Sequence, residues 1–425
     1  MDFDLLSQIF IRLTPEEFRD ARLAATADRV STYFTKKNPR LTYLGVAGIG
    51  RHGGALVFRE AHEDGVPFRN IVVKYSLDEE ADEDLRNEAV WLEMLRGAEH
   101  IIQLIPLAET NLNAGTGKRP TLAVEFISHG TLEMFRQRIG QECNLIPSRL
   151  LWRIFLCFIR QRIAMAYPPF GGPNAPIERE RIRHDRSPYA MTQNSAHANN
   201  ILIGDVAFDD AEHSMMPIFK LIDFGRGRVE DDFQDAQRIN VWGAAYLLMY
   251  LALPRYTAAE LSTDQFHGYV YTDDFGQQKI LYTACPMVFL DYTDIDRDLR
   301  DLIARCLCDD PATAPSLSEL LHWATQGASQ TFERFDRARR QTPWARAQET
   351  DEEIGRLLQR WVFDADIIGG PLEPKAFIKT RGLGLAPPNV PPPLPKKAPA
   401  PTSTLWQTFV KFVDQIRDTH PDDVD

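Results

Sequence analysis

Two side chains that carry oxygen ligands, Asn200 and Asp223, lie beside short apolar runs in the middle of this chain. Asn200 precedes Ile201-Leu202-Ile203, while Asp223 follows Leu221-Ile222 and precedes Phe224-Gly225. Amide and carboxylate oxygens are the ligands that Mg²⁺ prefers in proteins, and Mg²⁺ often sits on the phosphates of a nucleotide. The two side chains could therefore serve as ligands of a cation.

A glycine-rich segment closer to the N-terminus has the spacing Gly-x-Gly-x-x-Gly, at Gly48, Gly50 and Gly53. Glycine allows backbone amides to approach phosphate oxygens with no side chain between them. The segment lies between two strand-like runs, whereas the same spacing in a dinucleotide-binding fold opens a helix. The pattern fits a loop over nucleotide phosphates, and an ordinary hairpin turn fits it equally well.

A glutamate interrupts an apolar stripe in the predicted helix 82–96. Glu88 lies at helical spacing among Leu85, Leu92 and Leu95, so its carboxylate is expected to be buried. An unpaired buried charge costs several kcal/mol, so a cation should lie nearby. Lys74, at the end of an apolar strand, is the predicted partner. A solvent-facing lysine and a partly exposed glutamate would also fit each residue taken alone.

A sheet and a set of helices must hold these residues in place. Runs of β-branched and apolar residues predict a small antiparallel sheet. One helix is predicted before it, over 15–31, and the helix 82–96 lies between two of its strands in the sequence. The predicted strands are 41–44, 55–59, 71–74, 101–105 and 122–127. The predicted helices that follow are 150–167, 241–253, 296–307 and 317–324. The charged segment 168–189 is expected to be a solvated surface loop.

From Tyr43 to about Gly327 the sequence resembles the eukaryotic protein kinase family, most nearly the divergent kinase-like proteins common in filamentous fungi. The resemblance implies an α+β, bilobal protein kinase fold, with a small antiparallel sheet lobe and a larger, mainly helical lobe. It also implies ATP and Mg²⁺ as cofactors, with the glycine loop and Lys74 on the phosphates and Glu88 holding Lys74. Asn200 and Asp223 would hold the magnesium, and backbone groups from Glu125 to Ile127 would contact the adenine.

The resemblance breaks down on the side of the phosphate acceptor. Gln193-Asn194-Ser195 replaces the family's His-Arg-Asp, so Ser195 stands where the family has the aspartate that accepts the substrate proton. A serine hydroxyl is not a general base at neutral pH. His197 replaces a lysine that contacts phosphate; a phosphate contact and the role of an ordinary loop histidine are equally open.

Other losses lie on the same side. Residues 226–239 are short and contain no Ala-Pro-Glu, Ala314 replaces the arginine that would pair with that glutamate, and Asn240 replaces an aspartate. Losing both partners of a salt bridge together strands no buried charge, which favours a real loss. We therefore expect an ATP- and magnesium-binding pseudokinase with a regulatory or scaffolding role. The alternatives are an active but divergent phosphotransferase, acting on a protein or small-molecule hydroxyl, and a nucleotide-free interaction module.

The predicted organisation has six parts. A kinase-like N-lobe (41–127) follows an N-terminal helical extension (1–40) and precedes a C-lobe (128–327) with the insertion 168–189. A helical extension (328–383), a Pro-rich linker (384–403) and an amphipathic helix with an acidic tail (404–425) complete the chain. The terminal helix and the degenerate substrate face are the predicted contact regions for protein partners.

Composition limits the partners and the compartment. A net charge of -12 disfavours nucleic acid and anionic membranes as partners, because both need a clustered positive face. The five cysteines are few and mostly lie in apolar segments, as in reducing compartments, and Cys306 and Cys308 are expected to be buried thiols. With an acidic N-terminus and no run of about 18 apolar residues, the sequence predicts an intracellular protein, cytoplasmic or nuclear.

Overall fold

The structure is a computed structural model that describes residues 21–49, 53–61, 69–112, 119–142, 145–272, 276–338 and 342–365. The fold is α+β and contains a four-stranded antiparallel sheet. The predicted Pro-rich linker and terminal amphipathic helix lie outside the described residues. In the described ranges, none of the helices has the length and apolar character needed to cross a membrane.

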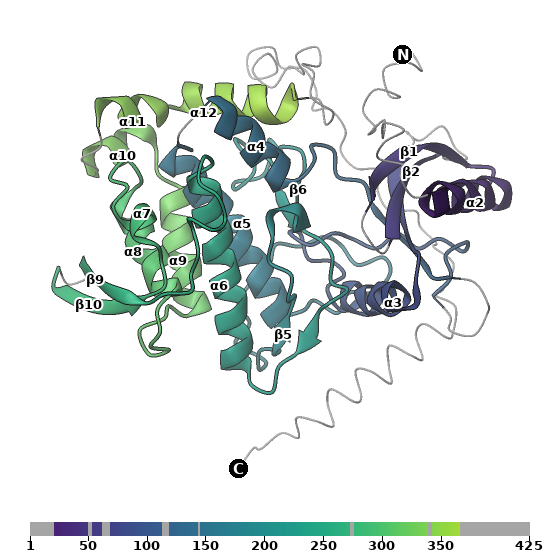
Figure 1. Ribbon diagram of the computed structural model, residues 1–425, viewed down its shortest axis with the longest axis horizontal. Helices are drawn as coiled ribbons and strands as arrows, with labels where there is room; N and C mark the ends of the chain where they lie inside the picture. The colour runs from purple at the N-terminus through teal and green to yellow at the C-terminus, as the bar shows by residue number, and fades with distance from the viewer. Residues whose placement is uncertain are drawn as a thin grey trace.

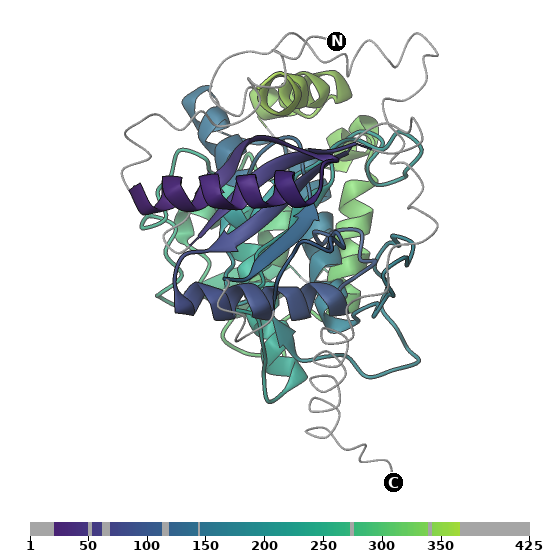
Figure 2. The ribbon, with the colours of Figure 1, turned by 90° about the vertical axis from the view of Figure 1, so that its right-hand side faces the viewer.

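The sheet has the order β1-β2-β3-β4 and every neighbouring pair is antiparallel. Its strands are β1 (Leu41–Ile49), β2 (Gly53–Glu60), β3 (Arg69–Ser76) and β4 (Thr121–Glu125). The register places Lys74 of β3 opposite Ala55 of β2 and Leu122 of β4. Helix α2 (Ala21–Lys37) packs against β1 and β2 (Figure 2). Strand β3 is hydrogen-bonded to β2 on one side and β4 on the other, which fixes the position of Lys74 in the sheet.

Some of the predicted elements differ from those observed. Helix α2 continues to Lys37, six residues beyond the predicted end, while the predicted start lies outside the described residues. Residues 101–105 form no strand, because their backbone hydrogen bonds are divided between β7 (Phe219–Leu221) and β4. Ile102 donates to the Leu221 carbonyl and Ile105 to the Ala123 carbonyl, so only isolated bridges form.

Helix α3 (Glu79–Met94) lies beside the sheet and contacts β3 and β4. Asp78 caps its N-terminus by accepting a hydrogen bond from the Ala81 N–H at 2.9 Å, so the helix begins three residues before the predicted Asp82. Gly97, at φ 93°, follows the helix in a left-handed conformation that glycine adopts without strain. The cap and this turn set the length of α3 and the level at which Glu88 faces β3.

A larger helical region surrounds α5 (Ser148–Ala166), which is buried along almost its whole length. It packs against α6 (Phe233–Ala252), α9 (Leu317–Ala328) and β7 (Phe219–Leu221) (Figure 1). The remaining helices are α4 (Leu132–Glu142), α7 (Met287–Leu290), α8 (Arg297–Cys306), α10 (Phe332–Ala338), α11 (Pro343–Gln348), α12 (Asp351–Leu358) and the π-helical turn η2 (Gln359–Phe363). Cys306 and Cys308 are buried free thiols, as predicted.

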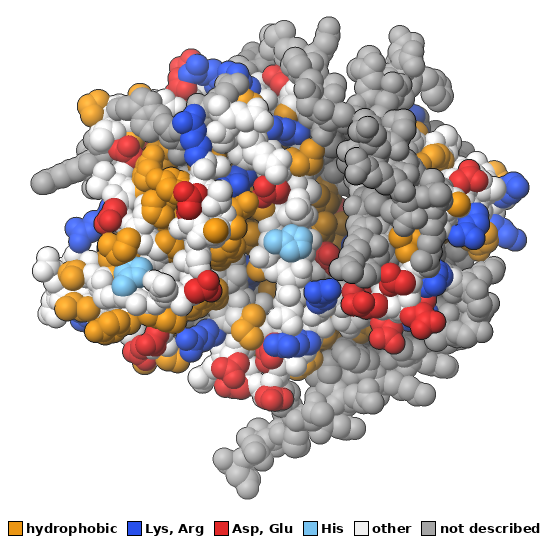
Figure 3. Space-filling model, viewed as in Figure 1, with side chains coloured by type: hydrophobic (Ala, Val, Ile, Leu, Met, Phe, Trp, Pro, Cys, Tyr) orange, Lys and Arg blue, Asp and Glu red, His pale blue; other side chains and the backbone are white. Residues whose placement is uncertain are grey.

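Short strand pairs join this region to the loops that carry the candidate site. β5 (Met191–Thr192) pairs with β8 (Arg228–Val229), and β6 (Ile201–Ile203) pairs with β7. A separate hairpin, β9 (His267–Thr272) and β10 (Gln278–Thr283), projects from the helical region. Its outer face carries the exposed side chains of Val270, Ile280 and Tyr282, and hydrophobic groups gather there in Figure 3.

The segment after α9 returns to the centre of the molecule. The Glu349 carboxylate, which is 1% exposed, accepts hydrogen bonds from the N–H groups of Ser148 at 2.7 Å and Arg149 at 2.9 Å. These are the first residues of α5, whose unpaired N–H groups and dipole favour an anion. Residues 342–363 therefore complete the central helix and stabilise it from outside the predicted kinase-like region.

Replacing Glu349 by alanine should lower the free energy of unfolding by about 2–4 kcal/mol, because two buried N–H donors lose a charged acceptor. Chemical denaturation measures this change. Glu352→Ala is the matched control, since Glu352 is exposed on α12 and its loss should cost less than about 0.5 kcal/mol. Equal effects of the two substitutions would contradict the capping role.

Candidate functional site

The predicted pair of Lys74 and Glu88 forms as expected. The Lys74 ammonium donates to both carboxylate oxygens of Glu88, at 2.6 and 2.8 Å. Glu88 is 2% exposed, while Lys74 keeps an opening to one side, with 20% of its side chain accessible. The pair joins β3 to α3 and leaves the lysine able to meet a further anion.

Helix α3 also holds the turn that carries Asp223. The Asn87 side-chain amide donates to the carbonyls of Gly225 at 2.8 Å and Gly227 at 2.9 Å. The Glu88 carboxylate accepts a hydrogen bond from the Phe224 backbone. Gly225 packs so closely on α3 that a Cβ there would lie 3.1 Å from the Asp84 Cβ. Lys74, Glu88 and Asp223 therefore belong to one rigid group.

The charges of this group do not balance. Burial alone would lower the pKa of Lys74, but the charges of Glu88 and Asp223 and the hydrogen bond from Glu88 together raise it. Burial raises the pKa of Glu88, Lys74 lowers it, and the charge of Asp223 raises it again. One ammonium faces two carboxylates, so the group attracts a further cation.

Gln193 has a structural role in the candidate site. Its side-chain amide donates to the carbonyls of Ile222 at 3.0 Å and Asp223 at 2.9 Å. Asn194 and Asp223 both have left-handed backbones, at φ 60° and 63°, which asparagine and aspartate tolerate better than most residues. The two loops are tied together and Asp223 is held in a constrained conformation. The signal in the sequence was the amide, which can donate two hydrogen bonds.

Asn200 faces Ser195 across the same loop. It ends the short 3₁₀ turn η1 (Ala198–Asn200), is 4% exposed, and donates from its side-chain amide to Ser195. The acceptors are the Ser195 carbonyl at 2.9 Å and its Oγ at 3.0 Å. The amide nitrogen is thereby directed toward Ser195, which leaves the side-chain oxygen available as an acceptor or ligand. His197 is exposed on the loop surface.

The glycine segment forms a hairpin between β1 and β2, with Gly48 paired to Ala55 and Ile49 to Gly54. A Cβ on Gly48 would meet no atom within 4 Å, so this position is open. A Cβ on Gly53 would lie 2.4 Å from the Tyr75 carbonyl oxygen, so the packing of β3 explains this glycine. Gly50 lies outside the described residues.

Glu125 and Ile127 continue from the end of β4. The Glu125 backbone N–H already donates to the Gln103 carbonyl at 2.9 Å, and its carboxylate pairs with Lys220 at 2.7 Å. The Glu125 side chain is thus structural, and any adenine contact at this residue would use its carbonyl. Ile127 is partly buried.

A groove lies beside the loop of Ser195. Helix α6 begins at Phe233 with Asp232 as its cap, eight residues before the predicted start, so residues 226–232 alone connect Gly225 to α6. The groove has a volume of ≈ 270 Å³. It is lined by Arg162, Gln193, Asn194, Ala196, Ile239, Asn240, Trp242, Gly243 and Tyr246. This short connection leaves the face of α6 next to Ser195 uncovered at Ile239, which is 38% exposed.

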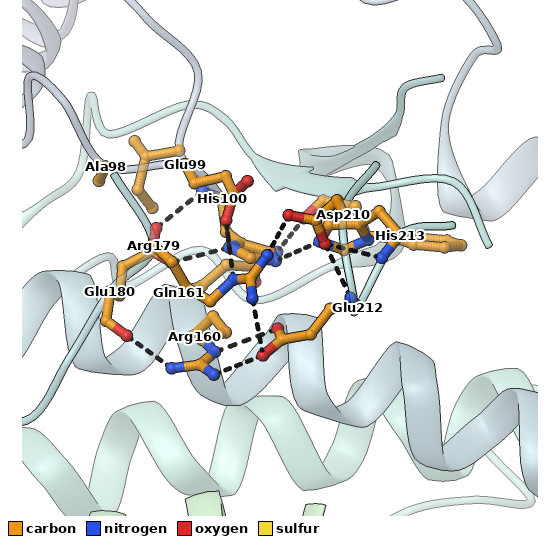
Figure 4. Close-up of polar contacts among 12 residues, drawn as sticks. Ala98, Glu99, His100, Arg160, Gln161, Arg179, Glu180, Asp210, Glu212 and His213 are labelled. Atoms are coloured by element: carbon orange, nitrogen blue, oxygen red, sulfur yellow. Dashed lines mark hydrogen bonds and ion pairs between the residues drawn. The ribbon is translucent and has the colours of Figure 1, made fainter. Parts of the chain in front are cut away.

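The insertion 168–189 is not a solvated loop throughout, which corrects the prediction. Glu180 is 6% exposed, and its carboxylate accepts from the His100 N–H and Nδ1, both at 2.7 Å (Figure 4). Arg179 pairs with Glu99, Asp210 and Glu212 (Figure 4). The high charge of this segment predicts exposure to solvent. Glu180 and Arg179 instead form ion pairs that are largely shielded from solvent. Asp185 of the same segment is exposed.

Two buried histidines meet inside this network, with 3.1 Å between their Nε2 atoms. Burial lowers the pKa of His100, but Glu180 and Cys157 raise it further, to about 10. Burial and the charge of His100 lower the pKa of His213 to about 3. The ligand atoms of His100, Cys157 and His213 lie within 4.8 Å of one another, a spacing that could hold a metal. Both ring nitrogens of His100 are already hydrogen-bonded, so we interpret the contact as a charged histidine donating to a neutral one.

Lys74→Met should lower the free energy of unfolding by about 3–5 kcal/mol, because it leaves the Glu88 carboxylate buried without a cation. The double variant Lys74→Met/Glu88→Leu should recover most of this loss, since no charge remains. A double-mutant cycle in urea tests the pair. Additive effects of the two substitutions would show that the contact has no role in stability.

The His100 interaction should depend on pH. Its pKa is raised in the folded state from 6.5 to about 10, so its contribution to stability is complete below pH 6.5 and is lost as pH rises toward 10. Unfolding curves of wild type and Glu180→Gln, which lacks the carboxylate charge, should therefore differ most near pH 6.5 and converge toward pH 10. A difference that stays constant over this range would contradict the charged state of His100.

No protein-family model matches this chain, and no curated protein matches it significantly.

Proposed function

We propose that this chain has the bilobal fold of a protein kinase and binds ATP with Mg²⁺, but serves as a regulatory or scaffolding pseudokinase. The observation that carries the proposal is the group formed by Lys74, the buried Glu88 and Asp223, held by α3. A sheet, a crossing helix and a helical region surround the group in the order that the resemblance implies.

On the nucleotide side, the residues present offer contacts for the phosphates of ATP and for Mg²⁺. Lys74 is held by Glu88 and remains accessible on one side, as required for a contact with phosphate. Asp223 adds a carboxylate to a group with excess negative charge, and Asn200 adds an oriented amide oxygen. In this proposal, Asn200 and Asp223 hold the metal and Lys74 meets the nearer phosphates. Gly48 offers an open backbone position above them.

The acceptor side lacks a base at the expected position. Ser195 Oγ accepts from Asn200, and a hydroxyl cannot take a proton at neutral pH as a carboxylate can. The connection 226–232 is too short to add the peptide platform of the family before α6 begins. Positioning and charge neutralisation still supply most of the rate in phosphoryl transfer. Slow transfer is therefore the second candidate, favoured by the groove beside Ser195.

ATP with Mg²⁺ should raise the melting temperature of the wild-type protein. Ligand at about 100 times its Kd adds about 2.7 kcal/mol to the stability of the folded state. Asp223→Asn should remove the dependence on Mg²⁺, and asparagine tolerates the left-handed backbone at this position better than alanine would. Asp185→Asn, in the exposed part of the insertion, is the control and should leave the shift unchanged.

Transfer of radiolabelled phosphate from ATP separates the two enzymatic readings. The pseudokinase predicts stabilisation without transfer in wild type. Transfer that Asp223→Asn abolishes would establish an active phosphotransferase instead, and the absence of any ATP-dependent shift would favour a nucleotide-free interaction module.

A further inference from the structure

We propose that the groove beside Ser195 is an anion-binding site, in which Arg162 receives a carboxylate or phosphate group of a ligand. The site lies between α5, α6 and the loop 193–196. It does not depend on nucleotide binding, and it goes beyond the proposed function by assigning a ligand chemistry to the acceptor side.

Arg162 is a buried cation with no counter-charge among the residues that the structure describes. It is 3% exposed, and its hydrogen bonds go to the Asn240 carbonyl at 3.1 Å and the Gln161 side-chain oxygen at 2.8 Å. Both acceptors are neutral. The burial lowers the pKa of Arg162 to about 10, so the group still carries its full charge at neutral pH.

The other buried arginines show how this chain usually treats such a charge. Each of them has a carboxylate within 4.0 Å, and the pairs are Arg96–Glu93, Arg136–Glu133, Arg149–Asp351 and Arg160–Glu212. Arg162 is the exception within the described ranges. Because an uncompensated buried charge costs several kcal/mol, its persistence here calls for an anion from outside.

The guanidinium is open toward the groove. Its Nε and Nη1 are occupied, whereas Nη2 has no hydrogen-bond partner in the described part of the chain. A Cβ on Gly243, which also lines the groove, would lie 3.9 Å from this Nη2 and 2.7 Å from the Ala196 Cβ. Glycine within α6 thus permits the close approach of the loop and leaves Nη2 uncovered, which offsets its cost in a helix.

The lining of the groove suits an anion. None of its residues is acidic, and Asn194 supplies a side-chain amide beside Arg162, whereas the amides of Gln193 and Asn240 already donate to backbone carbonyls. Asn240 stands where the resemblance expects an aspartate, so a negative charge is missing next to the guanidinium. A volume of ≈ 270 Å³ exceeds the roughly 30 Å³ of a water molecule several-fold, so a carboxylate or phosphate group fits. Trp242 and Tyr246 provide apolar walls for the rest of a ligand.

The position of the groove relates the anion to the candidate site. Asn194 and Ala196 line it, and Ser195 lies between them, held by Asn200. A ligand anchored on Arg162 would therefore sit directly beside the loop that would face the terminal phosphate of ATP. Such a ligand is either an acceptor or a regulator that carries an acidic group.

The test uses the full chain without nucleotide or Mg²⁺. Inorganic phosphate and malonate, titrated at constant ionic strength with chloride as the reference salt, should each be tested for thermal stabilisation and for binding by calorimetry. Arg162→Met keeps the length of the side chain and removes its charge, so it should weaken anion binding at least tenfold. Arg162→Lys keeps a charge without the planar fork and should bind with intermediate affinity.

Arg136→Met is the matched control. Arg136 is also buried and also donates to backbone carbonyls, of Tyr250 and Tyr256, but it does not line the groove. This variant should lose stability and keep anion binding. Arg162→Met should be as stable as wild type or more stable in the absence of anions, because it removes an unpaired charge.

Stabilisation by phosphate alone would assign the site to a phosphorylated group, and stabilisation by malonate alone would assign it to a carboxylate. Unchanged binding in Arg162→Met, or no binding of either anion to wild type at millimolar concentration, would overturn the proposal. It would also fail if Arg162→Met were as unstable as Arg136→Met, since Arg162 would then be a structural tether. ATP binding can succeed or fail independently of each outcome.

Discussion

The buried contact between Lys74 and Glu88 sets the geometry of the whole candidate site. A carboxylate at 2% exposure cannot remain charged at low cost without a cation, so β3 and α3 must approach until the ammonium reaches both oxygens. Helix α3 is then fixed relative to the sheet. Asn87, the residue before Glu88 on this helix, holds the turn at Gly225 and Gly227. A single electrostatic constraint thus brings the charge of Asp223 close enough to act on Lys74.

Two parts of the candidate site differ in their polar contacts and in their charge. Around Asp223 the backbone is held by side-chain hydrogen bonds, and the Gln193 amide ties its own loop to that of Asp223. Ser195 and Asn240 carry no charge, and the connection from Gly225 to α6 is short. In the proposed function this contrast favours ligand binding over rapid catalysis, and Arg162, which has no described counter-charge, lies beside Asn240.

Buried charges elsewhere in the chain have a stabilising role. Arg179 and Glu180 of the insertion are linked to α5 through Arg160. This arginine of α5 pairs with Glu212, which also pairs with Arg179, and it donates to the Glu180 carbonyl (Figure 4). Glu349 closes the N-terminus of α5 from the C-terminal side of the chain. The central helix therefore has charged supports near both of its ends. Each support brings together residues far apart in the sequence, so none of them could be paired in advance from local patterns.

The sequence by itself determined the apolar periodicities, and with them the four strands, the main helices and the burial of Glu88 beside Lys74. These follow from local rules, because side-chain spacing decides which face of an element meets the core. It could not determine that residues 101–105 divide their hydrogen bonds between two strands, or that Gln193 reaches the carbonyl of Asp223. It equally left undecided that Glu180 pairs with His100 and that Arg162 pairs with no described acid. Such facts depend on which distant groups meet in three dimensions, and only the tertiary structure decides whether a buried charge is neutralised or left open to a ligand.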